Sequence, residues 1–402
     1  MTLFRSLSTR AFALLWAGQT ISRLGDSLYR IALAWWVLEE TGSPVAMGSV
    51  MIVSVLPLVI TVLVGGTLAD RLPRARVMLV SDLLRGLLVG LIAALALTDA
   101  LTLWMIYIAA ATFGMVDAFF QPAYAAVVPE ITPRESLTSA NSLTSLSQQL
   151  AEVAGPALGA TIVAWGGTGW AFALDGLSFL ASAIFLMGLP ALKPERGEQM
   201  QAPILTDLGQ GLRTVFGTPW LWISIGLFSL LNITAGTPVN VGLPFLVKDT
   251  LHLDVSSLGL LYSLAAVGSL LGSVWLGRKD RIRRRGPFGY GLIVLAGLAT
   301  LSLGLPLGLA VLGGLMVVRG LAFSGFNLIW TNMVQELVPG EMLGRVTSVD
   351  YLGSFGLLPI GYALSGWAID AVGVQAVLVA GGGLTALVTL LGLLHPAIRR
   401  LD

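Results

Sequence analysis

Apolar runs of about 20 residues recur along the whole length of this 402-residue chain. At a rise of 1.5 Å per residue, a helix of that length crosses the ~30 Å hydrocarbon core of a bilayer. Charged residues make up only 11% of the chain, whereas a soluble protein carries roughly 25%. A transmembrane barrel would instead show short segments of alternating polarity. The sequence therefore predicts an all-α membrane protein with many helical spans.

Charged residues, glycines and prolines interrupt the apolar runs and divide the chain into twelve expected spans. The longest polar break, residues 193–213, falls between the sixth and the seventh span. We therefore expect a six-helix bundle over residues 1–190, a cytoplasmic linker over 191–218 and a second six-helix bundle over 219–402. Within the linker, ILTDLGQGLRTVF fits an amphipathic surface helix and a solvated linker about equally well. The expected spans are 11–38, 46–68, 77–97, 102–126, 138–164, 169–190, 219–247, 255–277, 288–306, 308–333, 343–369 and 374–394.

The distribution of basic residues predicts the orientation of these spans. If the N-terminus is cytoplasmic, the short loops on its side of the membrane are rich in arginine, and the opposite side holds only Lys248. Cytoplasmic loops carry the excess of Lys and Arg, so both termini are expected in the cytoplasm. The basic residues on that side are Arg71, Arg74, Arg76, Arg134, Arg345, the segment GRKDRIRRRG at 277–286, Arg399 and Arg400.

The two halves of the chain are copies of one another. PEITPRESL at 129–137 aligns without gaps with QELVPGEML at 335–343. The same offset pairs GPALGA, which begins at Gly155, with GYALSG, which begins at Gly361. Two homologous bundles that rock about a site at the membrane midplane are a common transporter plan. We therefore expect two bundles that move relative to each other, with a water-filled cavity between them.

The loop after the second expected span reads GGTLADRLPRAR at 65–76. It resembles the signature of the major facilitator superfamily, G-x-L-x-D-R-x-G-R-[RK]-[RK]. Glycine is usual at Pro73 and a basic residue at Ala75, so the match is incomplete. The matching positions are Gly66, Leu68, Asp70, Arg71, Arg74 and Arg76.

Further stretches carry the same resemblance over essentially the whole chain. AEVAGPALGA at 151–160 is similar to the G-P-x-x-G motif of the superfamily's antiporters, through Gly155, Pro156 and Gly159. DAFFQPAYAAVVPEITPRESLTSANSL at 117–143 and QELVPGEMLGRVTSV at 335–349 resemble the branch that includes macrolide and siderophore exporters. One departure concerns the fourth span, where many drug-exporting relatives carry an arginine and this chain has Asp117.

The resemblance implies the major facilitator fold and a function. It implies a monomeric exporter of amphipathic small molecules, drug-like compounds or secreted metabolites, in the bacterial cytoplasmic (inner) membrane. Transport would proceed by alternating access and proton antiport, with the proton gradient as the energy source and no cofactor. The expected partners are the substrate, protons and membrane lipids, and not nucleic acid. The alternative is a proton-independent flippase or facilitator for lysolipid or lipid-like molecules.

The sequence itself argues against other classes of function. It lacks the G-x-x-x-x-G-K-[ST] motif, so ATP is not the energy source within this chain. Cysteine is absent, and the two histidines, His252 and His395, lie far apart. We therefore expect neither an enzyme nor a metal site.

The first span carries a polar stripe, formed by Gln19, Arg23, Asp26 and Arg30 at spacings of four, three and four. These spacings place the four side chains on one helix face. Charges at membrane depth are costly and therefore face protein or water, usually with a partner. Asp26 can reach Arg23 or Arg30, one turn away. The stripe is interpreted either as a structural ion pair or as part of the substrate and proton pathway, in both cases facing the cavity.

The fifth span carries a second stripe, which includes Gln148, Glu152, Gly155 and Gly159. The glycines allow a neighbouring helix to approach closely, and Pro156 frees a backbone carbonyl. Glu152 has no basic residue within a turn on its own helix, and poor hydration of a carboxyl disfavours its charged form. It is therefore the leading candidate for the proton site, although a permanently protonated hydrogen-bonding group is the alternative.

The remaining intramembrane charges complete the hypothesis. Asp82 and Arg85, three residues apart, are expected to form a local pair. Asp117 is a candidate relay of protons toward Asp70, and Arg319 needs a carboxylate partner. By resemblance, the gating loop comprises Gly66, Asp70, Arg71 and Arg74. The candidate proton-coupling residues are Glu152, Asp26 and Asp117, and the candidate cavity residues are Gln19, Arg23, Asp26, Arg30, Gln148, Glu152 and Arg319.

Overall fold

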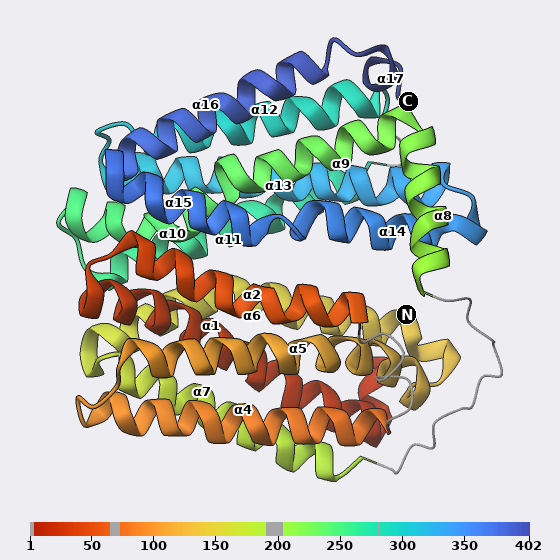
Figure 1. Cartoon of the computed structure of the whole chain (residues 1–402). Helices are drawn as coiled ribbons and strands as arrows, with labels where there is room; N and C mark the ends of the chain where they lie inside the picture. Colours follow the sequence, from red (N-terminus) through yellow and green to blue (C-terminus); the bar gives the residue numbers. More distant parts are fainter. Residues whose placement is uncertain (1–3, 65–72, 190–203, 280–281) are drawn as a thin grey trace. The chain divides into compact units, whose positions relative to one another are not determined.

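The computed structural model describes residues 4–64, 73–189, 204–279 and 282–402. Most of the residues in these ranges are helical and none of them lies in a β-strand (Figure 1). The all-α architecture predicted from the apolar runs is therefore confirmed. The chain divides into two compact units, which are described separately below.

The first unit comprises Met1–Gly42, Val53–Gly197 and Leu253–Ser263. Within it, α1 packs against α7 and α6, and α4 packs against α7 and α5. An apolar cluster closes one end of this unit around Phe12, Met78, Val127 and Leu143, which are buried. The principal helices are α1 (Arg10–Thr41), α4 (Arg74–Leu97), α5 (Leu103–Ile131), α6 (Leu137–Gly166) and α7 (Thr168–Met187), together with the larger part of α2 (Pro44–Val64).

The second unit comprises Ser43–Ile52, Glu198–His252 and Leu264–Asp402. Its helix α12 lies between α13 and α16, and α8 packs against α14. An apolar core cluster of this unit surrounds Tyr290, Phe326 and Trp330. The helices are α8 (Ile204–Gly217), α9 (Pro219–Leu231), α10 (Thr237–Phe245), most of α11 (Val255–Gly277), α12 (Arg285–Leu303), α13 (Leu309–Leu337), α14 (Gly340–Phe355), α15 (Leu358–Val372), α16 (Val374–Gly392) and α17 (Pro396–Arg399).

Within the described ranges, nine helical segments are long and apolar enough to cross a bilayer. They correspond to nine of the twelve expected spans. The other three expected spans are also helical, as α1, α2 and α6. Helices α1 and α6 contain the two polar stripes, which lower their mean hydropathy. The seventh expected span is one continuous helical segment, Pro219–Thr250, in which one π-helical turn at Asn232–Gly236 separates α9 from α10 and a second at Leu246–Thr250 follows α10.

The structure repeats at the offset that the sequence predicts. Helix α5 begins and ends 206 positions before α13, and the same offset relates the caps Gly167 and Gly373, whose φ values are +81° and +84°. The repeat extends to an ion pair. Arg74 at the start of α4 lies 3.3 Å from Glu130, and Arg285 at the start of α12 lies 2.6 Å from Glu336. Each unit therefore holds its third and fourth spans together in the same way.

Candidate functional site

Small residues bring α1, α4 and α7 together in the first unit. A Cβ atom on Gly18 would lie 3.3 Å from the Ser182 Cα atom, and one on Gly25 would lie 2.5 Å from Asp175 Oδ1. A Cβ atom on Gly176 of α7 would lie 3.0 Å from the Gly90 backbone nitrogen of α4. Close packing of this kind is typical of membrane helices, which associate through small residues. It leaves polar side chains of the three helices in direct contact.

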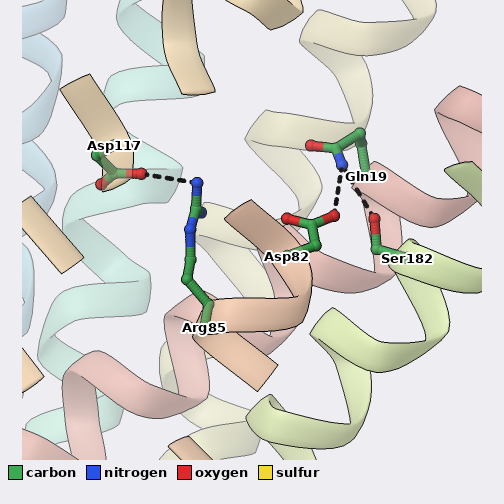
Figure 2. Close-up of polar contacts among 5 residues, drawn as sticks. All are labelled: Gln19, Asp82, Arg85, Asp117 and Ser182. Atoms are coloured by element: carbon green, nitrogen blue, oxygen red, sulfur yellow. Dashed lines mark hydrogen bonds and ion pairs between the residues drawn. The ribbon is translucent and has the colours of Figure 1, made fainter. Parts of the chain in front are cut away.

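Gln19, Asp82 and Ser182 form one such contact, with one residue from each of the three helices (Figure 2). The Gln19 amide Nε2 donates to Ser182 Oγ at 3.0 Å and to Asp82 Oδ2 at 3.5 Å. All three side chains are buried, and Asp82 Oδ1 has no hydrogen-bond partner among the described residues. Gln19 was expected to line an open cavity. It lies instead inside the bundle, because Gly18 lets α7 approach this face of α1.

Arg85 and Asp117 form an intramembrane ion pair, with Nη2 and Oδ1 3.2 Å apart (Figure 2). The Arg85 side chain is 5% exposed and that of Asp117 is 41% exposed. The guanidinium also lies over the Phe120 and Phe179 rings, 4.3 and 5.3 Å from their centroids. The expected local pair of Asp82 with Arg85 is therefore wrong, since the arginine extends across to α5. Although the fourth span has no arginine of its own, α4 supplies one to it.

Asp26 and Asp175 lie near this ion pair but outside it. Arg85, Asp117 and the arginines of α1 lie within electrostatic range of Asp26. Asp26 forms no hydrogen bond or ion pair with any described side chain, so the pairing expected with Arg23 or Arg30 is absent. Asp175 is fully buried and accepts a hydrogen bond from Ser178 at 3.3 Å, while its Oδ2 has no hydrogen-bond partner in the described part of the chain. The first unit thus contains carboxyl groups with unused hydrogen-bonding capacity around one buried guanidinium.

The two arginines of the α1 stripe have neutral partners. Arg23 Nη1 donates to Gln148 Oε1 of α6 at 2.8 Å, and its guanidinium lies 5.2 Å from the centroid of the Tyr124 ring. Arg30 Nη2 donates to Ser27 Oγ at 2.9 Å. Of the four stripe residues, Gln19 and Arg23 therefore contact different neighbouring helices, although one helix face carries both. Periodicity identified the face, and helix packing determined the partners.

Glu152 is connected to α1 through Gln148. The Gln148 Nε2 atom donates to Glu152 Oε1 at 3.1 Å, while its Oε1 accepts from Arg23. Glu152 and Gln148 are both exposed. The expectation of an isolated, poorly hydrated carboxyl is therefore corrected, because an amide links Glu152 to a guanidinium on another helix. Hydrogen bonds thus join Arg23 of α1, Gln148 and Glu152 in one row.

The glycines of the G-P-x-x-G stretch have the packing role expected of them. A Cβ atom on Gly155 would collide with the Ser27 Cβ atom, and one on Gly159 would lie 3.0 Å from the Leu28 Cα atom. Pro156 lies between them inside α6, in a helix that continues to Gly166. The motif thus sets the distance between α6 and α1 on the turn that follows Glu152.

Two further predictions concern the second unit and the gating loop. Arg319 donates from Nε to Thr300 Oγ1 at 3.2 Å and from Nη2 to the Ala235 carbonyl at 3.3 Å. Both acceptors are neutral, and the carbonyl belongs to a π-helical turn. In the gating loop, Arg74 pairs with Glu130. Gly66, Asp70 and Arg71 lie outside the described residues, as does the proposed relay from Asp117 to Asp70.

Sequence reasoning missed the position of Arg85 as the partner of Asp117, and the contact of Asp82 with Gln19 and Ser182. The available signal was the presence of two charges, Asp82 and Arg85, in an otherwise apolar span. The described residues contain no group of three His, Asp or Glu side chains placed to hold a metal ion. The carboxyl groups of the first unit are of a type that can exchange protons, and Arg85 can form ion pairs with them.

Comparison with known proteins identifies the class to which this arrangement belongs. The model of the Major Facilitator Superfamily matches residues 15–358 and, in an overlapping match, residues 240–400. The chain therefore belongs to this superfamily of membrane transporters, and the predicted major facilitator fold is confirmed.

The relatives support the predicted exporter branch. Macrolide efflux protein A of Streptococcus pyogenes is 24% identical, over 97% of this chain and 97% of that protein. The multidrug efflux pump Tap of Mycolicibacterium fortuitum is 28% identical, over 97% of this chain and 96% of the pump. The crystal structure of the nucleoside transporter NupG has the same fold, with a TM-score of 0.75 over 98% of this chain and 100% of NupG, at 14% identity.

Proposed function

We propose that the protein exports amphipathic small molecules from bacterial cells by proton antiport with alternating access. Its relatives named as efflux proteins support the class of substrate and the direction of transport. The proton coupling is supported by one observation, the ion pair between Arg85 and Asp117 within the membrane-spanning helices. In this proposal the protein resides in the cytoplasmic membrane with both termini in the cytoplasm.

The ion pair offers a physical route from protonation to movement. A proton on Asp117 removes the charge that holds Arg85, and a buried guanidinium without a counter-ion is unfavourable. Asp26 on α1 is another carboxylate within electrostatic range of Arg85. When Asp117 of α5 is protonated, Arg85 would therefore be attracted to Asp26 of α1 instead. A ligand can shift a conformational equilibrium only if it binds two states differently, and this exchange of partners supplies such a difference.

Glu152 and the two arginines of the α1 stripe have a second part in the proposal. Arg23, Gln148 and Glu152 form a row in which protonation of the glutamate alters the charge that the arginine experiences. Arg23, Gln148 and Glu152 would also contact substrate, with Arg30 at the exposed end of the stripe. Asp26, Asp117 and Glu152 thus remain the proposed proton-coupling residues. Arg74 and the loop before it remain the proposed gate.

Purified protein in liposomes tests the proposal. A lumen held more acidic than the outside should drive accumulation of a macrolide or a lipophilic cation, and protons should leave the lumen as substrate enters. Dissipating the gradient with a protonophore should stop accumulation, and protein-free liposomes provide the control. Substrate movement at the same rate with and without the gradient would contradict antiport. Movement of lysolipid at the same rate with and without the gradient would favour the flippase alternative.

A further inference from the structure

A basic pocket lies where the C-terminal segment of the second unit meets the start of α12. The chain turns back after α16, and α17 brings the C-terminal end to the beginning of α12 (Figure 1). The pocket is open and has a volume of about 810 Å³, within the ~300–1,000 Å³ range of small-molecule sites. The residues that line it are Arg284, Pro287, Leu393, Leu394, Pro396, Arg399 and Arg400.

The backbone around the pocket is held in place. Asp402 Oδ1 accepts a hydrogen bond from the Arg284 backbone N–H at 2.6 Å, and the Gly286 N–H donates to the Leu401 carbonyl at 3.2 Å. Ile398 is fully buried in the core cluster of the second unit. Because Ile398 fixes α17, the two residues that follow it project from a defined position. The pocket is therefore preorganised, which lowers the entropic cost of binding a ligand.

The charge of the pocket suits an anion. The side chains of Arg284, Arg399 and Arg400 are exposed, and none has a hydrogen-bond or ion-pair partner among the described residues. The described residues that line the pocket include three arginines and no acidic side chain. The side chain of the nearby Asp402 already accepts the backbone hydrogen bond of Arg284. Guanidinium groups bind phosphate through paired N–H donors, so a phosphate group is the natural ligand.

An apolar ridge leads along the membrane span to the pocket. Leu384, Leu387 and Leu391 recur at helical spacing on α16, Leu394 follows in the turn after the helix, and all four are exposed, Leu394 to 72%. The opposite side of α16 packs against α12. A free phosphate ion would gain nothing from this ridge, whereas acyl chains would cover it.

We propose that this pocket binds the phosphate headgroup of an anionic membrane phospholipid, whose acyl chains lie along the leucine ridge of α16. Basic pockets at the ends of membrane helices are known recognition sites for anionic headgroups. The combination of three arginines with a contiguous apolar ridge distinguishes this lipid from a zwitterionic one and from free phosphate. The inference does not depend on the transported substrate or on proton coupling.

Native mass spectrometry of the full chain in detergent tests the site, with phosphatidylglycerol and phosphatidylcholine as probes. The wild-type protein should retain phosphatidylglycerol in preference to phosphatidylcholine. Each arginine near a membrane surface contributes about a fewfold to tenfold in affinity, so R399Q/R400Q should weaken phosphatidylglycerol binding by about thirtyfold. R5Q/R10Q removes two exposed charges elsewhere on the chain and should leave binding unchanged.

Two further measurements separate the sources of phosphate. L391S/L394S should weaken lipid binding and leave the binding of inorganic phosphate unaltered. Inorganic phosphate that displaces the lipid at equal concentration would show a free-anion site and overturn the proposal. Equal retention of the two lipids, or equal behaviour of R399Q/R400Q and R5Q/R10Q, would also overturn it. None of these results would affect the proposed transport activity, because binding is measured without transport.

Discussion

At the scale of single residues, the energy of the Arg85–Asp117 pair can be measured directly. In D117N the buried guanidinium loses its counter-ion. We expect a loss of about 1–3 kcal/mol in the free energy of unfolding, less than the ~3–5 kcal/mol of a fully buried pair, because Asp117 is partly exposed. The further change R85Q should cost little once Asp117 is neutral. A double-mutant cycle, followed by unfolding in SDS, should therefore give a coupling energy of about 1–3 kcal/mol.

The pair Arg74–Glu130 is the matched control, because its arginine side chain is 35% exposed, against 5% for Arg85. Solvent screening limits pairs with an accessible arginine to about 0–1 kcal/mol. The cycle R74Q/E130Q should therefore give the smaller coupling energy. Equal coupling in both cycles would contradict the view that the Arg85–Asp117 pair derives its strength from burial.

The partners of the charged residues show the limit of prediction from the sequence at this scale. The 3.6-residue period correctly placed Gln19 and Arg23 on one face of α1. It did not reveal that Gln19 faces α7 or that Arg23 faces α6, because each partner depends on which helix packs at that height. Arginine adds to the difficulty, since its long side chain lets Arg85 bypass the nearby Asp82 and reach Asp117 on another helix.

At the scale of helices, Gly155 determines how closely α6 approaches α1. A Cβ atom there would collide with Ser27 of α1, so G155A should force the helices apart and cost about 1–3 kcal/mol. A Cβ atom on the equivalent Gly361 would lie 3.0 Å from the Thr237 side chain, a tight contact but not a collision. G361A should therefore cost less. Apparent melting temperatures in detergent would rank the variants.

Gly90 of α4 provides the neutral control for these glycine substitutions. A Cβ atom on Gly90 would meet no atom within 4 Å. G90A should leave the melting temperature unchanged or raise it, because alanine favours the helix over glycine. A drop in G90A as large as that in G155A would mean that helix flexibility, and not the close approach to Ser27, explains the effect.

The existence of the helices was predictable, and their interruptions were not. Apolar runs located every span to within several residues, and the matched glycines at 167 and 373 end α6 and α15 in the same way. The seventh and eleventh expected spans contain breaks, with π-helical turns in the former and an interruption between Phe355 and Leu358 in the latter. A π-helical turn has no periodic signature of its own, because it adds only one residue to a turn of a continuing helix.

At the scale of the whole molecule, duplication preserved the frame and the ion pair between the third and fourth spans of each unit, but not the other intramembrane charges of the first unit. The repeat offset of 206 pairs Asp117 with Phe323, Asp175 with Gly381 and Glu152 with Leu358. Gly86 and Gly297 pack against the equivalent glycines Gly176 and Gly382, which pairs Arg85 with Ala296. These charged residues of the first unit thus have glycine or apolar residues at the equivalent positions of the second unit.

This asymmetry predicts which unit responds to protons. Asp350 is an intramembrane carboxyl of the second unit, and it accepts hydrogen bonds from Trp330 at 2.8 Å and Ser354 at 3.2 Å. An asparagine at position 350 can still accept the bond from Trp330, so D350N should retain gradient-driven transport to within about twofold. In D117N the rate of gradient-driven transport should fall at least about tenfold. Position 117 then stays neutral, so protonation can no longer make Arg85 change its partner. Substrate accumulation in liposomes with an acidic lumen measures both variants, and substrate binding without a gradient checks that each protein is folded. Loss of the gradient response in D350N with its retention in D117N would place proton coupling in the second unit and contradict the assignment.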